Sequence, residues 1–296
     1  MRMPGNNFPD SEYKRLRRVL LYQPGPEIAN ITDPESVLHL RRIDYPGIKK
    51  EYRKIQECFR RLSIKVFMLK PRDNPDRAGQ NLFNLIYTRD LFFMSPKGAI
   101  IAKMASSVRS KEPGQVRKLL KGSGIPVIGA VKGQGTFEAA DALWLNNKLV
   151  VVGVGRRTNA AGFKQVKKTL AGQGIRCISV PAPKITLHLL GSLQLIDSDL
   201  ALVRADYPYM DLFDLLRNNK IKIIKVPANA EVKEKQAMNI VCVAPRKIIM
   251  PADCPRTREF YRKRKIKIAA ELKLAELANG AGGLACATAV ISRDIN

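Results

Sequence analysis

A short sequence pattern recurs five times along the chain. In each copy, an amphipathic stretch rich in basic residues ends in a short β-branched run led by an isoleucine. The leading isoleucines are Ile64, Ile125, Ile175, Ile221 and Ile266, at spacings of 61, 50, 46 and 45 residues. Periods of this length are typical of repeated supersecondary modules. Each copy predicts a helix followed by a strand.

A second pattern, in which two apolar runs flank a turn, interleaves with the first. Its four copies begin at Leu91, Ala142, Leu193 and Asn239, and their turn residues (Ser-Pro-Lys-Gly, Asn-Asn, Asp-Ser-Asp and Ala-Pro-Arg-Lys) favour hairpins. A fifth pair can be assembled from RVLLYQP near the N-terminus and CATAVISR near the C-terminus. Pairing of these terminal strands would close a ring of five α/β modules and leave few exposed sheet edges. We therefore expect residues 1–296 to form one domain.

Composition excludes several classes of protein. Hydrophobic residues make up 45% of the chain and charged residues 26%, which is typical of a folded soluble protein and not of a disordered one. No apolar run approaches the roughly 18 residues that span a bilayer, and MRMPGNN lacks the apolar stretch of a signal peptide. Five cysteines without a CxxC pair, and only two histidines, favour neither a disulfide framework nor a zinc site. These features predict a cytoplasmic protein without a membrane partner.

The net charge is the one unusual number. Lysine and arginine total 52 against 26 acidic residues, so the formal charge is +26. Such a balance can attract nucleic acid. However, the basic residues are spread along the chain, and the densest cluster, residues 256–267, resembles the polar face of a helix. A non-catalytic nucleic-acid-binding protein therefore remains only a weaker alternative.

Polar residues stand at equivalent places just before the predicted hairpins. They are Asp90, Glu138, Asp141, His188, Asn239 and Cys286. Equivalent positions in a ring of modules converge on its axis, so these residues are expected to share one pocket. Carboxylates, a histidine and a cysteine can hold a cation and supply a base and a nucleophile. Arg109 and Arg157 follow Asp90 and Glu138 by 19 residues each, which indicates matching places in neighbouring modules.

Each of these residues also has a purely structural interpretation. A cysteine is usually a small buried hydrophobe, and Cys58, Cys177, Cys242 and Cys254 lie in or beside apolar segments. Cys286 differs, because the small residues of NGAGGLAC would let a substrate approach closely. His188 could be a core histidine, Asp141 a strand-entry cap and Arg157 a surface charge.

Several segments together resemble the guanidine-modifying, or pentein, superfamily. They are RVLLYQPGPEI, RRIDYPGIKKEYRKIQ, NLFNLIYTRDLFF, FEAADALWL, VVGVGRRTN, TLHLLGSLQLID, QAMNIVCVAP and NGAGGLACATAV, in order from Arg18 to the C-terminus. This superfamily includes arginine deiminase, dimethylarginine dimethylaminohydrolase and the amidinotransferases. The resemblance implies a five-bladed α/β propeller of pseudo-fivefold ββαβ modules.

The resemblance also implies a role for each candidate residue. Cys286 would attack the guanidinium carbon to form a covalent thiouronium, and His188 would act as general acid and base. Asp90 and Glu138 would clamp the guanidinium nitrogens. The substrate-binding residues implied by the resemblance are Asn84, Arg109 and Arg157, which would hold the α-carboxylate. Asp141 is a further expected substrate-binding residue, because a pocket for a cation in so basic a chain needs concentrated negative charge. No metal or organic cofactor is implied.

The chain departs from the superfamily pattern at three places. The usual Glu-Gly-Gly-Asp motif has alanine at its two central positions, Leu190 stands where deiminases and amidinotransferases have an aspartate, and Ala285 replaces a histidine found in some relatives. We therefore predict a hydrolase acting on the guanidino group of arginine or an N-methylated arginine. Transfer of the amidino group to an acceptor amine remains an alternative, and a homodimer stays open.

Overall fold

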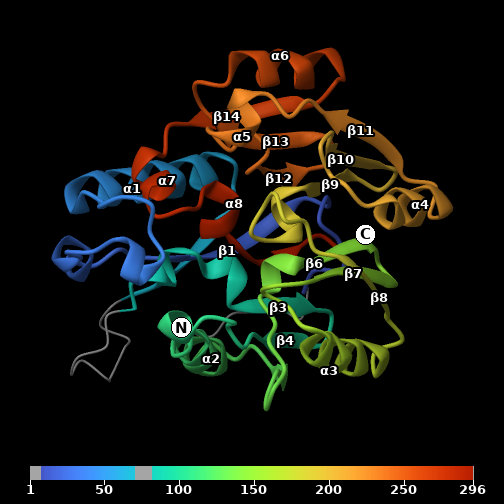
Figure 1. Cartoon of the computed structure of the whole chain (residues 1–296), viewed down its shortest axis with the longest axis horizontal. Coiled ribbons are helices and arrows are strands. Elements are labelled where there is room, and N and C mark those ends of the chain that lie inside the picture. The colour runs from blue at the N-terminus through green and yellow to red at the C-terminus, as the bar shows by residue number, and fades with distance from the viewer. Residues whose placement is uncertain (1–7, 71–81, 296) are drawn as a thin grey trace.

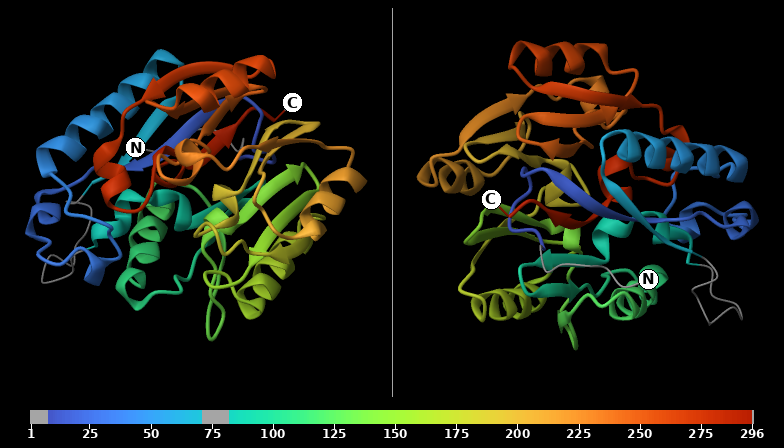
Figure 2. Two further views of the ribbon diagram at one scale, coloured as in Figure 1. Left: turned by 45° about the horizontal axis from the view of Figure 1, so that its top comes forward. Right: turned by 180° about the vertical axis from the view of Figure 1, so that it is seen from behind.

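The computed structural model describes residues 8–70 and 82–295, so Asn81 of the NLFNLIYTRDLFF segment and the N-terminal MRMPGNN lie outside the described residues. Five separate three-stranded sheets form the fold (Figures 1 and 2). The first sheet joins the two ends of the chain in the order β15-β1-β2, from β1 (Leu16–Tyr22), β2 (Lys65–Leu69) and β15 (Ala289–Arg293).

The other four sheets follow one another along the sequence. They comprise β3 (Phe92–Ser95), β4 (Gly98–Ile101) and β5 (Val127–Ala130); β6 (Ala142–Asn146), β7 (Leu149–Val154) and β8 (Arg176–Pro181); β9 (Leu193–Asp197), β10 (Leu200–Arg204) and β11 (Lys222–Val226); and β12 (Val241–Ala244), β13 (Lys247–Pro251) and β14 (Lys267–Leu272). In each sheet the central strand pairs with one antiparallel and one parallel neighbour.

A helix connects the two parallel strands of every sheet, as the repeat predicts. These helices are α1 (Tyr45–Arg61), α2 (Glu112–Gly122), α3 (Ala160–Ala171), α4 (Met210–Asn218) and α6 (Pro255–Lys263), and they lie at the periphery in Figure 1. The basic cluster at residues 256–267 therefore does fall largely on a helix, α6, and continues into β14. No helix in the described part of the chain is long and apolar enough to cross a membrane.

The recurring isoleucine has a structural explanation. In all five modules, the residue before it has a positive φ between 58° and 78°, and the isoleucine N–H donates to the carbonyl five residues earlier at 2.9–3.2 Å. The left-handed residues are Ser63, Gly124, Gly174, Lys220 and Lys265. This pairing is typical of the Schellman motif, in which an apolar residue follows the left-handed turn and packs back on the helix. One local motif thus fixes both the end of the helix and the start of the following strand.

The prediction that the two ends of the chain pair is confirmed. β1 and β15 run antiparallel, with Leu16 opposite Arg293 and Val19 opposite Val290. The described strands nevertheless form five distinct sheets, and no single sheet closes on itself. The five repeated sheets are thus established, whereas closure into a propeller remains a prediction. A large shared core, with Trp144 stacked on Phe93 at 5.6 Å between ring centroids, packs the sheets together.

Candidate active site

A cavity of about 490 Å³ lies where the modules meet. Six of the eight predicted site residues line it, namely Asn84, Asp90, Arg109, Arg157, His188 and Cys286. Glu138 and Asp141 are both fully buried and are not among the residues that line the cavity. Leu190 and Asn239, which the sequence analysis named, also line the cavity, and so does His39, the second histidine of the chain.

The candidate catalytic side chains all lie in or directly beside the same short turn of their modules. A short helical turn precedes the antiparallel edge strand of four sheets: η5 (Thr88–Asp90), η7 (Ala139–Asp141), η8 (Leu189–Gly191) and α8 (Leu284–Ala287). Asp90 ends η5, Glu138 and His188 each precede η7 and η8 as N-cap residues, and Cys286 lies in α8. The repeat therefore brings one functional group per module to a common centre.

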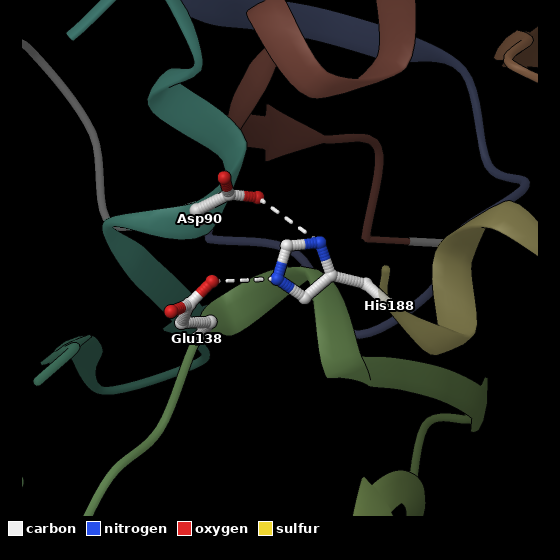
Figure 3. Close-up of side chains that lie close together, drawn as sticks. All are labelled: Asp90, Glu138 and His188. Atoms are coloured by element: carbon white, nitrogen blue, oxygen red, sulfur yellow. Dashed lines mark hydrogen bonds and ion pairs between the residues drawn. The ribbon is translucent and has the colours of Figure 1, made fainter. Parts of the chain in front are cut away.

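The imidazole of His188 lies between two carboxylates (Figure 3). Its Nε2 is 2.7 Å from Oε2 of Glu138, and its Nδ1 is 3.8 Å from Oδ1 of Asp90. Burial alone would lower the pKa of His188, but the charges of Asp90, Glu138 and Asp141 outweigh burial and raise that pKa to about 9. His188 is therefore an imidazolium at neutral pH and can donate a proton.

Both carboxylate oxygens of Glu138 contact protein groups, and the shortest of these contacts is with His188. Besides the His188 contact, its Oε1 accepts the backbone N–H of Ala105 at 3.1 Å and lies 3.6 Å from Nη1 of Arg157. Burial alone would raise the pKa of Glu138, but the hydrogen bond from His188 and the nearby arginines lower it. Glu138 is thus ionised and fixes both the position and the charge of the histidine.

The two arginines each pair with the acid 19 residues before them. Nη1 of Arg109 is 2.6 Å from Oδ2 of Asp90, just as Arg157 meets Glu138 in the next module. Arg109 also donates from Nε to Glu112 at 2.9 Å and is almost completely buried. It therefore fixes one oxygen of Asp90, while Oδ1 makes no hydrogen bond with any residue that the structure describes.

The residues expected to hold an α-carboxylate differ in how many of their polar atoms already bond to protein groups. Nη2 of Arg109 faces the carbonyls of Asn84 and Tyr87 at 3.4 and 3.5 Å, so all three of its nitrogens have protein partners. Asn84 donates to the carbonyl of Val37 at 2.8 Å, and its Oδ1 is 3.2 Å from Nε2 of His39. Arg157 is more exposed than these two and is the better placed to meet an anion.

Asp141 lies outside the cavity lining and supports the backbone beside His188. It accepts the Thr158 hydroxyl at 2.7 Å and the N–H of Leu189 at 3.0 Å. Burial raises the pKa of Asp141 to about 6. Its contacts fit the alternative interpretation of a local cap better than direct substrate contact, because both of its oxygens face protein donors.

Cys286 is the most exposed of the five cysteines, all of which are free. Cys58, Cys177, Cys242 and Cys254 are buried, as expected for small hydrophobic residues. Burial of the Cys286 thiol and the charge of Asp90 raise its pKa, while hydrogen bonds to the sulfur oppose that rise. Together these effects favour the protonated thiol of Cys286, and a further cation bound beside the sulfur would favour the thiolate.

The same carboxylates could in principle serve a metal ion. Ligand atoms of Asp90, Glu138 and His188 all lie within 4.8 Å of one another. A metal bound there would have to break the 2.7 Å contact between Glu138 and His188 and displace the proton from a histidine whose pKa is about 9. The geometry fits an organic cation placed beside the imidazolium better than a metal held by it.

Comparison with known proteins identifies the family. The sequence profile described as arginine deiminase matches residues 60–207 and 208–293. The chain belongs to the arginine deiminase family. It is thereby a member of the pentein superfamily of enzymes that modify guanidino groups, as the sequence motifs indicate.

Individual relatives of this arginine deiminase family member are distant. An N(G),N(G)-dimethylarginine dimethylaminohydrolase from Streptomyces coelicolor is 25% identical over 175 residues, 59% of this chain and 62% of that protein. A variant dimethylarginine dimethylaminohydrolase from Pseudomonas aeruginosa, solved with citrulline, superposes with a TM-score of 0.76 at 19% identity, covering 94% of this chain and all of that one. An amidinotransferase from Microseira wollei gives 0.79 at 18%, covering 99% and 98%. The fold is therefore shared by hydrolases and transferases.

The sequence analysis assigned no role to two residues of this family member's cavity. His39 is buried and contacts Asn84, although its position matches no other module. Asn239 was placed correctly by the repeat but received no role. The signal for Asn239 was its position before a hairpin, which it shares with the reactive residues; His39 offered no such signal.

Proposed function

We propose that this chain is a cysteine-dependent hydrolase of the guanidino group of arginine or an N-substituted arginine, built as a single-domain, five-bladed propeller and working in the cytoplasm. One observation carries the proposal: the imidazole of His188, which lies between Asp90 and Glu138, lines the same cavity as the partly exposed cysteine, Cys286. A candidate acid, a candidate nucleophile and a carboxylate that can face a cation, Asp90, thus line one cavity.

In the first step, the guanidinium enters beside Asp90, whose Oδ1 makes no hydrogen bond within the described residues and can accept its N–H groups. The positive charge of the substrate favours the thiolate of Cys286, which releases its proton to the solvent. The sulfur attacks the guanidinium carbon and a C–S bond forms. His188 donates its proton to the nitrogen of the leaving amine as the C–N bond breaks. The products of this step are a thiouronium on Cys286, a free amine and neutral His188.

In the second step, neutral His188 takes a proton from water, whose oxygen attacks the same carbon. The C–S bond then breaks and returns the thiolate, leaving a ureido group on the substrate. The proton released from that product is taken up by the free amine, so the net reaction converts guanidinium and water into urea and ammonium. Glu138 keeps the imidazole in place and stabilises its charged form throughout.

The proposal is tested by identifying products with mass spectrometry. Incubation with arginine or methylated arginines in ¹⁸O-water is expected to give a citrulline carrying one heavy oxygen, together with ammonia or a methylamine. An amidinotransferase would instead need an added amine and would yield a new guanidine without heavy oxygen. Tight, salt-sensitive binding of nucleic acid with no product from any guanidine would contradict both enzymatic proposals.

Leu190 predicts a preference for substituted guanidines. Its side chain is buried and lines the cavity, where it provides apolar surface instead of a charged acceptor. An unsubstituted guanidinium loses a charge-assisted hydrogen bond there, worth about 1.5–3 kcal/mol. An N-methyl group loses nothing at that edge and gains roughly 0.8 kcal/mol of apolar contact. We expect Leu190→Asp to shift the ratio of kcat/KM values towards arginine by about tenfold or more.

The matched control is Leu190→Asn, which has nearly the same shape as the aspartate but no charge and should shift the ratio much less. Both ratios come from initial rates with arginine and N-methylated arginines. The interpretation of Leu190 is wrong if the native enzyme strongly prefers arginine and Leu190→Asp leaves that preference unchanged.

A further inference from the structure

Asn239 makes a direct contact with the sulfur of Cys286. Its Nδ2 is 3.2 Å from Sγ, within hydrogen-bond reach of a sulfur acceptor. Asn239 lies just before β12, whereas Cys286 lies in α8, 47 residues further along the chain. The contact therefore joins two modules at the candidate nucleophile.

The neighbouring hydrogen bonds fix the orientation of this amide. Oδ1 of Asn239 accepts the backbone N–H of Ala285 at 2.6 Å, which requires the carbonyl oxygen to face α8. The other end of the amide then carries the N–H groups. One of them points to Oε1 of Gln236 at 3.1 Å and the other to Sγ. The group facing the sulfur is thus a hydrogen-bond donor and cannot be an acceptor.

A donor at this place acts differently on the two forms of cysteine. A hydrogen bond to a charged acceptor is stronger than one to a neutral acceptor, so the Asn239 N–H stabilises a thiolate more than a thiol. The charged and titratable groups around the sulfur act in both directions. Asp90 disfavours the thiolate and Arg109 favours it, the imidazolium of His188 lines the same cavity, and the phenols of Tyr52 and Tyr87 interact electrostatically with Cys286.

We propose that Asn239 is a positioning residue for the reaction: its amide fixes the Cys286 sulfur in the cavity and stabilises it as the thiolate that attacks the guanidinium carbon. The inference rests on the proposed role of Cys286 as nucleophile. Two contacts from one side chain, to Sγ and to the N–H of the preceding residue, hold both the sulfur and the turn that carries it.

The close packing of Gly283 against the amide of Asn239 independently supports a specific role for this amide. A Cβ added to Gly283 would lie 2.8–3.1 Å from the amide atoms of Asn239, which is too close. The φ of Gly283 is −147°, so an alanine is acceptable to the backbone itself. Gly283→Ala therefore displaces the amide from the sulfur without changing its chemistry.

The test measures alkylation of Cys286 by iodoacetamide as a function of pH, followed by mass spectrometry of its peptide, in the full-length protein without substrate. In Asn239→Ala, the midpoint of the alkylation profile should rise by about one to two pH units, because the thiolate loses its donor. Asn239→Asp keeps the acceptor for Ala285 but faces the sulfur with a carboxylate, so its rise should be at least as large. Gly283→Ala should show a smaller rise in the same direction.

Turnover gives a second readout. Since Asn239 acts through the nucleophile, kcat should fall by roughly 10- to 100-fold in Asn239→Ala while KM changes by less than about threefold. The near-isosteric Asn239→Asp variant guards against a folding defect, which thermal unfolding would reveal. The inference is overturned if the midpoints of the folded variants agree with the parent within about 0.3 pH units. Shifted midpoints in a protein that hydrolyses no guanidine would reject the proposed function and support the thiolate contact.

Discussion

Cys286→Ser is expected to lower turnover of the best guanidino substrate by about four orders of magnitude or more, because a hydroxyl is a far weaker nucleophile than a thiolate. The fold should survive, since serine is nearly the same size and the residue is only partly buried. Initial rates and thermal unfolding of both proteins measure these two effects. Cys58→Ser is the matched control, because Cys58 is also a free cysteine but lies in α1, away from the cavity lining.

Acid quenching during turnover should trap the covalent step directly. The peptide that contains Cys286 should gain the mass of the substrate less the leaving amine, and no other cysteine peptide should. Near-normal activity of Cys286→Ser, or an adduct on a different residue, would contradict the proposed mechanism as a whole.

His188→Gln is expected to reduce kcat by roughly 10²–10⁴-fold, the usual contribution of a general acid and base. The first step should slow much less when the leaving group needs no proton. A substrate with a thioether in place of the leaving amine therefore separates the role of His188 as acid from its role as base. With that substrate the Cys286 adduct should still form and then accumulate, because no base activates the water. Equal losses with both substrates would contradict the role of His188 as the acid.

The pH dependence of the native enzyme follows from the same residue. The pKa of His188 is raised to about 9, so the imidazolium that must donate the proton persists through neutral pH and is lost above it. We expect kcat/KM to fall on the alkaline side with a midpoint near 9, since kcat/KM reports the free enzyme. This alkaline limb should be absent in His188→Gln when the thioether substrate is used.

The repeat made most of the architecture predictable. The five isoleucines mark helix ends that are closed by one local motif, so their signal is carried by neighbouring residues. Pairing of β1 with β15 was predictable for a different reason: four copies of a hairpin left one pair to be assembled from the ends. What local sequence does not contain is whether the five sheets merge or stay separate, because packing between modules decides that.

The candidate site was predictable in its members and less so in their contacts. Their positions in the repeat indicated which residues converge. Asp141, however, bonds Thr158 and Leu189 and does not line the cavity. Likewise, Arg109 is engaged by Glu112 as well as Asp90, and no spacing reveals that both acids share one arginine. These outcomes depend on side-chain direction over short distances, which periodicity does not specify.

The meeting of the two ends in one sheet also sets the order in which the site can be assembled. Cys286 lies three residues before β15, and the hydroxyl of Thr88, two residues before Asp90, bonds the carbonyls of both Leu20 in β1 and Ala287 in α8. These contacts span most of the sequence, so closing them requires the most distant segments to find each other and is expected late in folding. During synthesis, the carboxylates and the histidine leave the ribosome well before the cysteine. We therefore expect the candidate site to remain inactive until β15, the last strand, has paired with β1.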